Sequence, residues 1–171
     1  RAEPAAAETK WTWTGWGGGG FYWSAVFDPA DADVIYLGGD VAGLYKSVDR
    51  GGTWRFINRG LHEYGVYSLA IAKNDPKVLY AMTPNGMARS ANGGDDWVRL
   101  PATFKSALNL STRRGGTVRG VAVDPADADT VYAGSGDGRL CKSVDGGRSW
   151  APLDYLAALA AETPAGASPA A

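Results

Sequence analysis

One eight-residue phrase, Ser-x-Asp-x-Gly-x-Thr-Trp or a close variant, occurs three times in this chain. The three copies occupy residues 47–54, 90–97 and 143–150. Their first residues lie 43 and 53 positions apart. Such a recurrence is typical of repeat proteins, in which each copy is one supersecondary unit. The phrase therefore limits the possible folds more than any other feature of the chain.

Each copy of the phrase predicts a hairpin turn between two short strands. An Asp or Asn side chain binds nearby backbone amides, and glycines tolerate the positive φ that a tight turn needs. The tryptophan that follows brings a large apolar surface into the next strand. We assign a structural role to Ser47, Asp49, Gly51 and Trp54, to Ser90, Asn92 and Trp97, and to Ser143, Asp145 and Trp150.

The second copy departs from the pattern, since Asn92 replaces the Asp and Asp96 replaces the Thr. We expect its turn to be less tightly held than the other two. Apart from this, the three phrases resemble the Asp-box of bacterial neuraminidase repeats, which sialidases, sortilin-like receptors and xyloglucanase-type glycoside hydrolases share. The resemblance implies a β-propeller in which each box is a structural turn at the outer edge of a blade, away from the ligand site.

The repeat extends beyond the box. Residues 25–54 align without a gap on residues 121–150, and the middle copy, 69–97, has one residue fewer before Gly86. In the first copy the apolar and β-branched residues predict four strands, at about 22–27, 34–38, 43–47 and 54–57. Four antiparallel strands in each repeat of this length are typical of a propeller blade.

The sequence thus predicts an all-β propeller built of four-stranded antiparallel blades, with three blades present. Closed propellers have four to eight blades, so we expect a partial ring that further blades or a protein partner complete. The predicted parts are an N-terminal tail at 1–10, a partial propeller at 11–153, and a short helix with an Ala/Pro-rich tail at 154–171. Within the propeller we expect a closing strand at 11–14 and blades at about 21–58, 65–101 and 117–153.

Composition excludes several classes of function. The 17 basic and 18 acidic residues give no net charge that would favour nucleic acid, and no apolar run is long enough to span a membrane. The single cysteine, Cys141, takes the place of Tyr45 in the first repeat, which predicts a buried thiol. No His, Cys or carboxylate cluster has metal-site spacing, so we expect neither a metal nor a cofactor.

The chain begins at Arg1 without an initiator methionine, which fits either a processed export product or a cropped chain. We expect an extracellular or periplasmic protein of bacterial origin.

The first blade also resembles xyloglucanase-type hydrolases. The resemblance rests on residues 11–22, with four glycines in a row at 17–20, and on residues 34–45. It implies that Asp40 is one of two catalytic carboxylates. Inverting glycosidases need a general acid and a general base roughly 6.5–9.5 Å apart, and in that family the second carboxylate belongs to a second propeller. Sialidase chemistry needs an arginine trio, which no motif here supplies.

Aromatic residues surround the glycine run. Aromatic faces stack on sugar rings or fill partner pockets, although the same side chains could instead pack between blades. His62, the only histidine, is interpreted as an ordinary loop residue. The candidate binding residues are Trp16, Phe21, Tyr22, Trp23 and, at the entry to the second blade, Tyr64.

Two functions follow from these patterns. The first is a non-catalytic exported module that binds a protein or a glycan, or that serves as a structural subunit of a larger assembly. The alternative is a fragment of a xyloglucanase-like glycoside hydrolase with Asp40 as one of its two catalytic carboxylates. A strong repeat signal without a complete catalytic set favours the first, and whether the chain belongs to an enzyme stays open.

Overall fold

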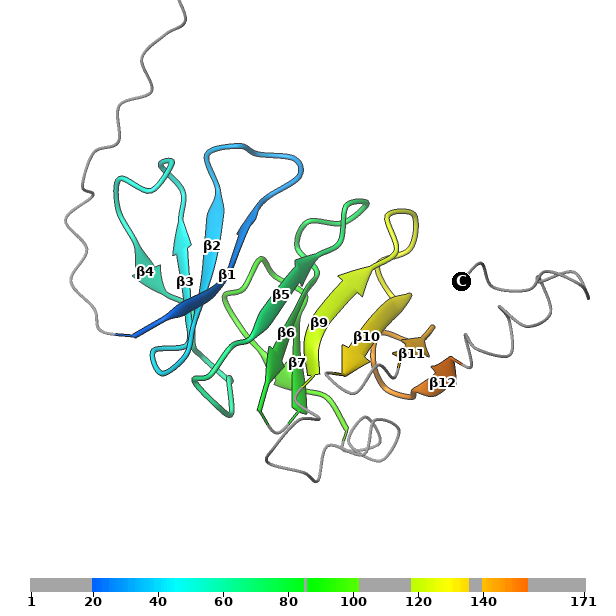
Figure 1. Ribbon diagram of the computed structural model, residues 1–171. Coiled ribbons are helices and arrows are strands. Elements are labelled where there is room, and N and C mark those ends of the chain that lie inside the picture. The colour runs from blue at the N-terminus through cyan, green and yellow to red at the C-terminus, as the bar shows by residue number, and fades with distance from the viewer. Residues whose placement is uncertain (1–19, 85, 102–117, 136–139, 154–171) are drawn as a thin grey trace, which may run out of the picture.

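The computed structural model describes residues 20–84, 86–101, 118–135 and 140–153. Within these ranges the chain forms three four-stranded antiparallel sheets and no helix, arranged side by side like the blades of a fan (Figure 1). The predicted all-β architecture of three propeller blades is therefore confirmed. The tail at 1–10, the closing strand at 11–14, Trp16 and the helix and tail at 154–171 lie outside the described residues.

Each sheet holds four consecutive strands, paired in chain order. Blade 1 contains β1 (Tyr22–Phe27), β2 (Ile35–Gly39), β3 (Leu44–Ser47) and β4 (Arg55–Phe56). Blade 2 contains β5 (Ser68–Ile71), β6 (Leu79–Thr83), β7 (Gly86–Ser90) and β8 (Val98–Arg99). Blade 3 contains β9 (Val118–Val123), β10 (Val131–Ser135), β11 (Leu140–Ser143) and β12 (Ala151–Leu153).

The turn between the first two strands of a blade is held by its own aspartates. Asp28 Oδ1 accepts the Ala30 N–H at 2.8 Å, and Asp31 Oδ1 accepts the Asp33 N–H at 3.0 Å. Blade 3 repeats both bonds with Asp124 and Asp127. Such side-chain bonds to the backbone two residues on favour turns over regular structure, which explains why the strands end here.

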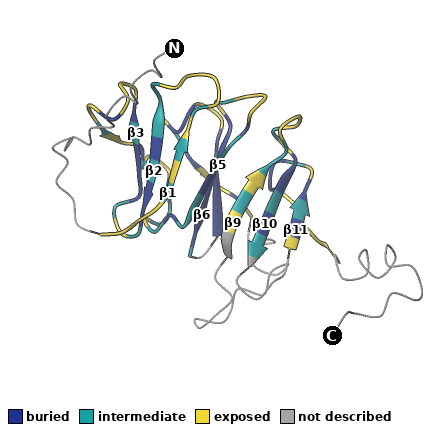
Figure 2. Cartoon of the chain, turned by 45° about the horizontal axis from the view of Figure 1, so that its top comes forward, coloured by how far each residue is buried: buried dark blue, intermediate teal, exposed yellow. Residues whose placement is uncertain are grey.

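The middle sheet is buried on both faces. One apolar cluster joins it to blade 1 through Tyr36, Leu44 and Trp97, and a second joins it to blade 3 through Met82 and Val131. Every residue of β6 is buried (Figure 2). The first strands β1, β5 and β9 lie next to one another, so they are the innermost strands of the fan.

Each box joins the third strand of its blade to the fourth. In the first copy, Ser47 Oγ accepts the Gly51 N–H at 2.7 Å and Asp49 Oδ1 accepts the Thr53 N–H at 2.8 Å. In the second copy, Gly94 donates to Ser90 Oγ and Asp96 donates to Asn92 Oδ1, both at 2.9 Å. The second turn therefore keeps both backbone bonds, because the amide oxygen of Asn accepts the same backbone bond that a carboxylate does. It differs in its tryptophan: Trp97 donates to the Ile57 carbonyl of blade 1, whereas Trp54 and Trp150 donate to carbonyls of their own turns.

The predicted burial of Cys141 is confirmed, since its side chain is fully buried between blades 2 and 3. The strand pairing also separates the boxes from Asp40. Ser47 pairs with Ile35 at one end of blade 1, whereas Gly39, next to Asp40, pairs with Tyr22 at the other end.

Candidate functional site

Asp40 lies directly after β2, where the entry to blade 1 meets the entry to blade 2. Its N–H donates to the Phe21 carbonyl at 2.9 Å. The preceding residue, Gly39, accepts the Val66 N–H at 2.8 Å, which brings the start of blade 2 to the same place. Because β1 and β5 are innermost strands, Asp40 stands at one end of the central axis of the fan.

Gly20 shapes the space around the Asp40 carboxylate. Its φ is +117°, in the region that favours glycine, and a β-carbon added here would overlap Asp40 Oδ1. The carboxylate therefore lies directly against the backbone that enters blade 1. The last glycine of the run is needed both for its backbone conformation and for this close approach.

Exposed aromatic side chains extend the site from Asp40 toward blade 2. Phe21 leaves 74% of its surface exposed, and its ring lies 6.3 Å from that of Trp23. Trp23 in turn meets the ring of Tyr67 edge to face, at 5.6 Å between centroids. Tyr64 is also exposed, and its carbonyl accepts the Gly43 N–H at 2.8 Å. Phe21, Trp23 and Tyr67 form one aromatic platform that spans two blades.

Tyr22 is oriented differently from its two neighbours. Its ring packs edge to face on Tyr45, which in turn lies 4.4 Å from the Phe56 ring. Burial first, then Tyr45 and the Asp40 charge, raise the pKa of Tyr22. Of the four predicted binding residues that the structure describes, Tyr22 therefore belongs to the side of blade 1 rather than to the aromatic platform.

Asn58 supports the turn that carries Asp40, a role that the sequence patterns do not reveal. Its Oδ1 accepts the Leu44 N–H at 2.7 Å, and its Nδ2 donates to the Ala42 carbonyl at 2.9 Å. Gly43, with φ +80°, has no room for a β-carbon beside Asn58. One amide side chain thus bridges both sides of the β2–β3 turn, which limits the positions that Asp40 can adopt.

His62 lies beside the end of β6. Its Nε2 lies 3.2 Å from the hydroxyl of Thr83 at the end of β6 and 3.9 Å from Glu63 Oε2. Within the described ranges, no group of three or more His, Cys, Asp or Glu residues could hold a metal ion. The same ranges contain no helix with the length and apolar character needed to cross a bilayer.

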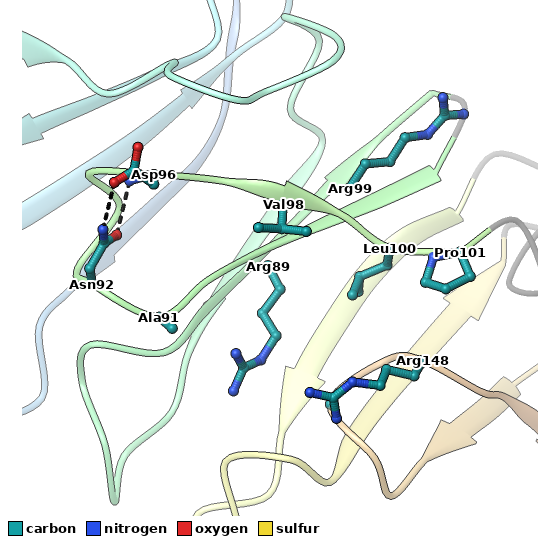
Figure 3. A pocket seen from close by; sticks show the side chains of 10 residues that line it. Arg89, Ala91, Asn92, Asp96, Val98, Arg99, Leu100, Pro101 and Arg148 are labelled. Carbon is teal, nitrogen blue, oxygen red and sulfur yellow. Dashed lines mark hydrogen bonds between the residues drawn. The ribbon is translucent and has the colours of Figure 1, made fainter.

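A groove of about 540 Å³ lies elsewhere, over the outer strands of blades 2 and 3 (Figure 3). Arg89 and Arg148 extend into it from opposite sides, above an apolar floor that includes Leu100. At the corresponding contact between blades 1 and 2, ion pairs join the two blades. They link Arg55 to Asp95 at 2.5 Å and Arg59 to Asp96. Blade 3 has Arg148 and Ser149 in place of those acids.

Comparison with known proteins supports the propeller fold and the resemblance of this chain to xyloglucanases. No family model matches the chain. Among curated proteins, a xyloglucanase from Hypocrea jecorina is 30% identical over 159 residues, which cover 83% of this chain and 19% of the relative. A solved ancestral GH74 enzyme is 25% identical with a TM-score of 0.65, and the match covers 86% of this chain and 20% of that one.

Other solved propellers are similar to this chain in fold only. YCF48 bound to a D1 peptide is 19% identical, with a TM-score of 0.59, over 78% of this chain and 40% of that protein. The chain spans about a fifth of the length of the xyloglucanase it matches. It is therefore a β-propeller segment whose relatives include glycoside hydrolases, and this relationship supports the hydrolase alternative better than the non-catalytic one.

Proposed function

We propose that this chain forms part of a glycoside hydrolase that cleaves xyloglucan or a closely related glucan, with Asp40 as one of its two catalytic carboxylates. The observation that carries the proposal is the placement of Asp40 against Gly20, where its N–H bonds to Phe21, the first residue of the platform. A carboxylate next to exposed aromatic rings combines proton transfer with sugar stacking. The similarity to xyloglucanases supports the choice of substrate class.

The chemistry assigns Asp40 a role in proton transfer. In an inverting enzyme one carboxyl group protonates the leaving oxygen, while a second carboxylate activates a water molecule on the opposite face of the sugar. Either role requires a carboxylate held in one place by fixed neighbours. The backbone bond from Asp40 to Phe21 and the Asn58 bonds across the turn provide that support. The second carboxylate comes from a further part of the hydrolase.

The aromatic platform binds the glucan chain. Glucose rings present apolar faces that stack on tryptophan and tyrosine, so we expect successive sugars to lie across Phe21, Trp23 and Tyr67. Tyr64 is exposed at the entry to blade 2, and Tyr22 packs on Tyr45 within blade 1. A polymeric plant glucan is an extracellular substrate, which is why we place the protein outside the cytoplasm.

Binding and catalysis are tested separately. We expect xyloglucan oligosaccharides to bind this chain in isothermal titration calorimetry, and Trp23→Ala to weaken binding at least tenfold. Asp40→Asn keeps the shape of the side chain and is expected to leave the affinity within about threefold. In the hydrolase that contains this chain, Asp40→Asn should lower kcat by roughly 100-fold or more, because a catalytic proton-transfer group is lost.

Two results would contradict the proposal. Binding that Trp23→Ala leaves unchanged would remove the platform from the site. Hydrolysis that continues at the wild-type rate in the Asp40→Asn variant would exclude Asp40 from catalysis. Val98→Ala, a truncation on the outer edge of blade 2, is the control for both measurements, because Val98 is exposed and remote from Asp40.

A further inference from the structure

The segment that joins blade 1 to blade 2 also holds the turn between β2 and β3. We call this segment, residues 58–66, the linker; it lies between β4 and β5. The Tyr64 carbonyl of the linker accepts the Gly43 N–H at 2.8 Å, at the end of the turn. The Val66 N–H donates to the Gly39 carbonyl at the same distance, at the start of the turn. Two backbone bonds therefore tie the turn that carries the candidate catalytic carboxylate to the start of blade 2.

Asn58, at the beginning of the linker, binds the same turn through its side chain. Its amide accepts the Leu44 N–H and donates to the Ala42 carbonyl, so one group serves a donor and an acceptor of the turn. An ionised carboxylate can only accept and an ammonium group can only donate, which makes an amide the suitable group for this place. The backbone of Asn58 is itself held, since its carbonyl accepts the Leu61 N–H at 3.0 Å. The amide is therefore a fixed support for the turn.

The other repeats lack this combination of carboxylate and amide. Counted along the aligned repeats, Pro84 of blade 2 takes the place of Asp40, and Pro101 takes the place of Asn58. Blade 3 has Gly136 at the place of Asp40. Blade 2 nevertheless forms the same four strands, so neither group is needed to build a blade. Their joint presence in blade 1 points to a role in the site and not in the fold of the repeat.

We propose that Asn58 positions the Asp40 carboxylate for proton transfer, by holding the β2–β3 turn and not by touching the glucan. The inference rests on the proposed function, because it gives Asn58 a role in the same site. A proton-transfer group must lie within hydrogen-bond reach of the atom that it serves. The bond from Asp40 to Phe21 fixes the start of the turn, and the Asn58 bonds fix its other side. The direction of the carboxylate depends on both supports.

Loss of the amide should lower kcat and leave KM nearly unchanged. The aromatic platform is anchored elsewhere, since Trp23 lies within β1 and Tyr67 donates its N–H to the Met82 carbonyl at 2.9 Å. In the hydrolase that contains this chain, we expect Asn58→Ala to lower kcat for xyloglucan by about tenfold or more, because a displacement of about 1 Å can cost roughly 100-fold in rate. KM should stay within about threefold of the wild-type value.

Asn58→Asp makes the same support dependent on pH. An ionised carboxylate still accepts the Leu44 N–H, but it places a second acceptor against the Ala42 carbonyl, whereas a protonated carboxyl group donates there as the amide does. The ratio of variant to wild-type kcat should therefore be low at neutral pH and rise as the pH falls through the pKa of the new carboxyl group. Asn58→Ala has no titrating group, so its ratio should stay low and constant over the same range.

Hydrogen exchange measures the turn independently of catalysis. Mass spectrometry of a peptide that covers residues 39–45 should show faster exchange in Asn58→Ala, because the Leu44 N–H loses its acceptor. Asn74→Ala is the matched control, since Asn74 Nδ2 also donates to a carbonyl, that of Ala126 at 3.0 Å. Asn74 lies on the β5–β6 turn, at the other end of the sheets, so its truncation should change neither kcat nor the exchange of this peptide.

The results distinguish this inference from the proposed function. Wild-type kcat in Asn58→Ala, together with an inactive Asp40→Asn hydrolase, would overturn the role of Asn58 and keep that of Asp40. Wild-type kcat in Asp40→Asn would overturn the proposed function, and with it the reason to position the carboxylate. An Asn58→Asp ratio that does not vary with pH would exclude the donated bond to Ala42 as the support. This last variant keeps the test available if Asn58→Ala does not fold, because both of its bonds form at low pH.

Two further outcomes would also overturn the positioning role. A KM that rises as much as kcat falls would make Asn58 a glucan-binding residue. A loss of activity in Asn58→Asp without any loss in Asn58→Ala would trace the effect to the new charge near Asp40 and not to the missing amide.

Discussion

The side-chain amide of Asn92 donates to Oδ2 of Asp96 at 2.9 Å, while Asn92 Oδ1 accepts the Asp96 N–H at the same distance. The first repeat has Asp49 and Thr53 at these places, and there the Thr hydroxyl donates to the carboxylate at 2.7 Å. The two substitutions in the second box thus compensate each other, because donor and acceptor have exchanged sides.

Replacing only one member of this pair should be costly. Asn92→Asp places two carboxylates within hydrogen-bond distance, and we expect a loss of roughly 1–3 kcal/mol of stability at pH 7. The loss should shrink near pH 4, where one carboxyl group can take up a proton and donate the bond. The double variant Asn92→Asp/Asp96→Thr, which recreates the first box, should recover most of the stability. Urea unfolding at both pH values measures the effect, and an equally stable single variant at pH 7 would contradict it.

The other two boxes predict a loss of stability in acid. Hydrogen bonds from the Thr53 side chain, then from its backbone N–H and from Ser47, lower the pKa of Asp49 to about 2. Ser149 does the same for Asp145, whose pKa is also about 2. Because both pKa values are lower in the folded state, the stabilisation is complete above the ordinary pKa of about 3.9 and is lost as the pH falls towards 2.

Thermal unfolding between pH 5 and pH 2 measures this dependence. We expect the melting temperature of the wild type to fall steeply over that interval. Asp49→Asn lacks the titrating group, so its melting temperature should be lower at pH 5 and should fall less steeply. Identical slopes for the two proteins would exclude Asp49 as a source of the acid sensitivity.

The contact between blades 2 and 3 should depend on its tyrosine hydroxyl more strongly than the contact between blades 1 and 2 does. Tyr80→Phe leaves the partly buried Ala128 carbonyl without the 2.8 Å bond, and we expect a loss of roughly 1 kcal/mol. Tyr36→Phe should cost less, because the Gly93 carbonyl that accepts the Tyr36 hydroxyl also accepts a bond from Lys46. Chemical denaturation of the two variants gives the comparison. A larger loss for Tyr36→Phe would show that Lys46 does not replace the hydroxyl.

The middle sheet should be the most sensitive part of the core. Met82→Ala removes a fully buried side chain of β6 from the apolar cluster that joins blade 2 to blade 3. A loss of roughly 2–5 kcal/mol is expected for such a truncation. Val98→Ala, on the exposed surface of β8, should stay within about 0.5 kcal/mol of the wild type. Comparable losses for the two variants would contradict the burial of β6 between blades.

Gly20 should be required for activity more than for stability. Gly20→Ala places a methyl group where the Asp40 carboxylate lies and forces a residue with a side chain to adopt a φ of +117°. Displacing a catalytic group by about 1 Å can cost roughly 100-fold in rate, and we expect a loss of that size in xyloglucan hydrolysis. A variant with full activity would show that the carboxylate does not need its position against Gly20.

Much of the fold could be predicted from the sequence because its signals are local. Turn aspartates such as Asp28 and Asp145 bond to backbone two to four residues away, and strands lie between such turns. The predicted first-blade strands at 22–27 and 43–47 agree with β1 and β3 to within one residue. The burial of Cys141 was also predictable, since its repeat partner is Tyr45, an apolar residue.

The candidate site was predictable only in part. The glycine run and Asp40 are visible in the sequence, but the contact of Trp23 with Tyr67 joins two blades, and the bonds from Asn58 cross from one loop to another. Alternation along β1 places Tyr22 on the face opposite Trp23, but it does not reveal that the Tyr22 ring packs on Tyr45. The sequence alone therefore determined the blades and their turns, because each turn forms within a few residues. Only the tertiary structure decided which aromatic rings meet at the entries to blades 1 and 2, because those contacts join residues far apart in the chain.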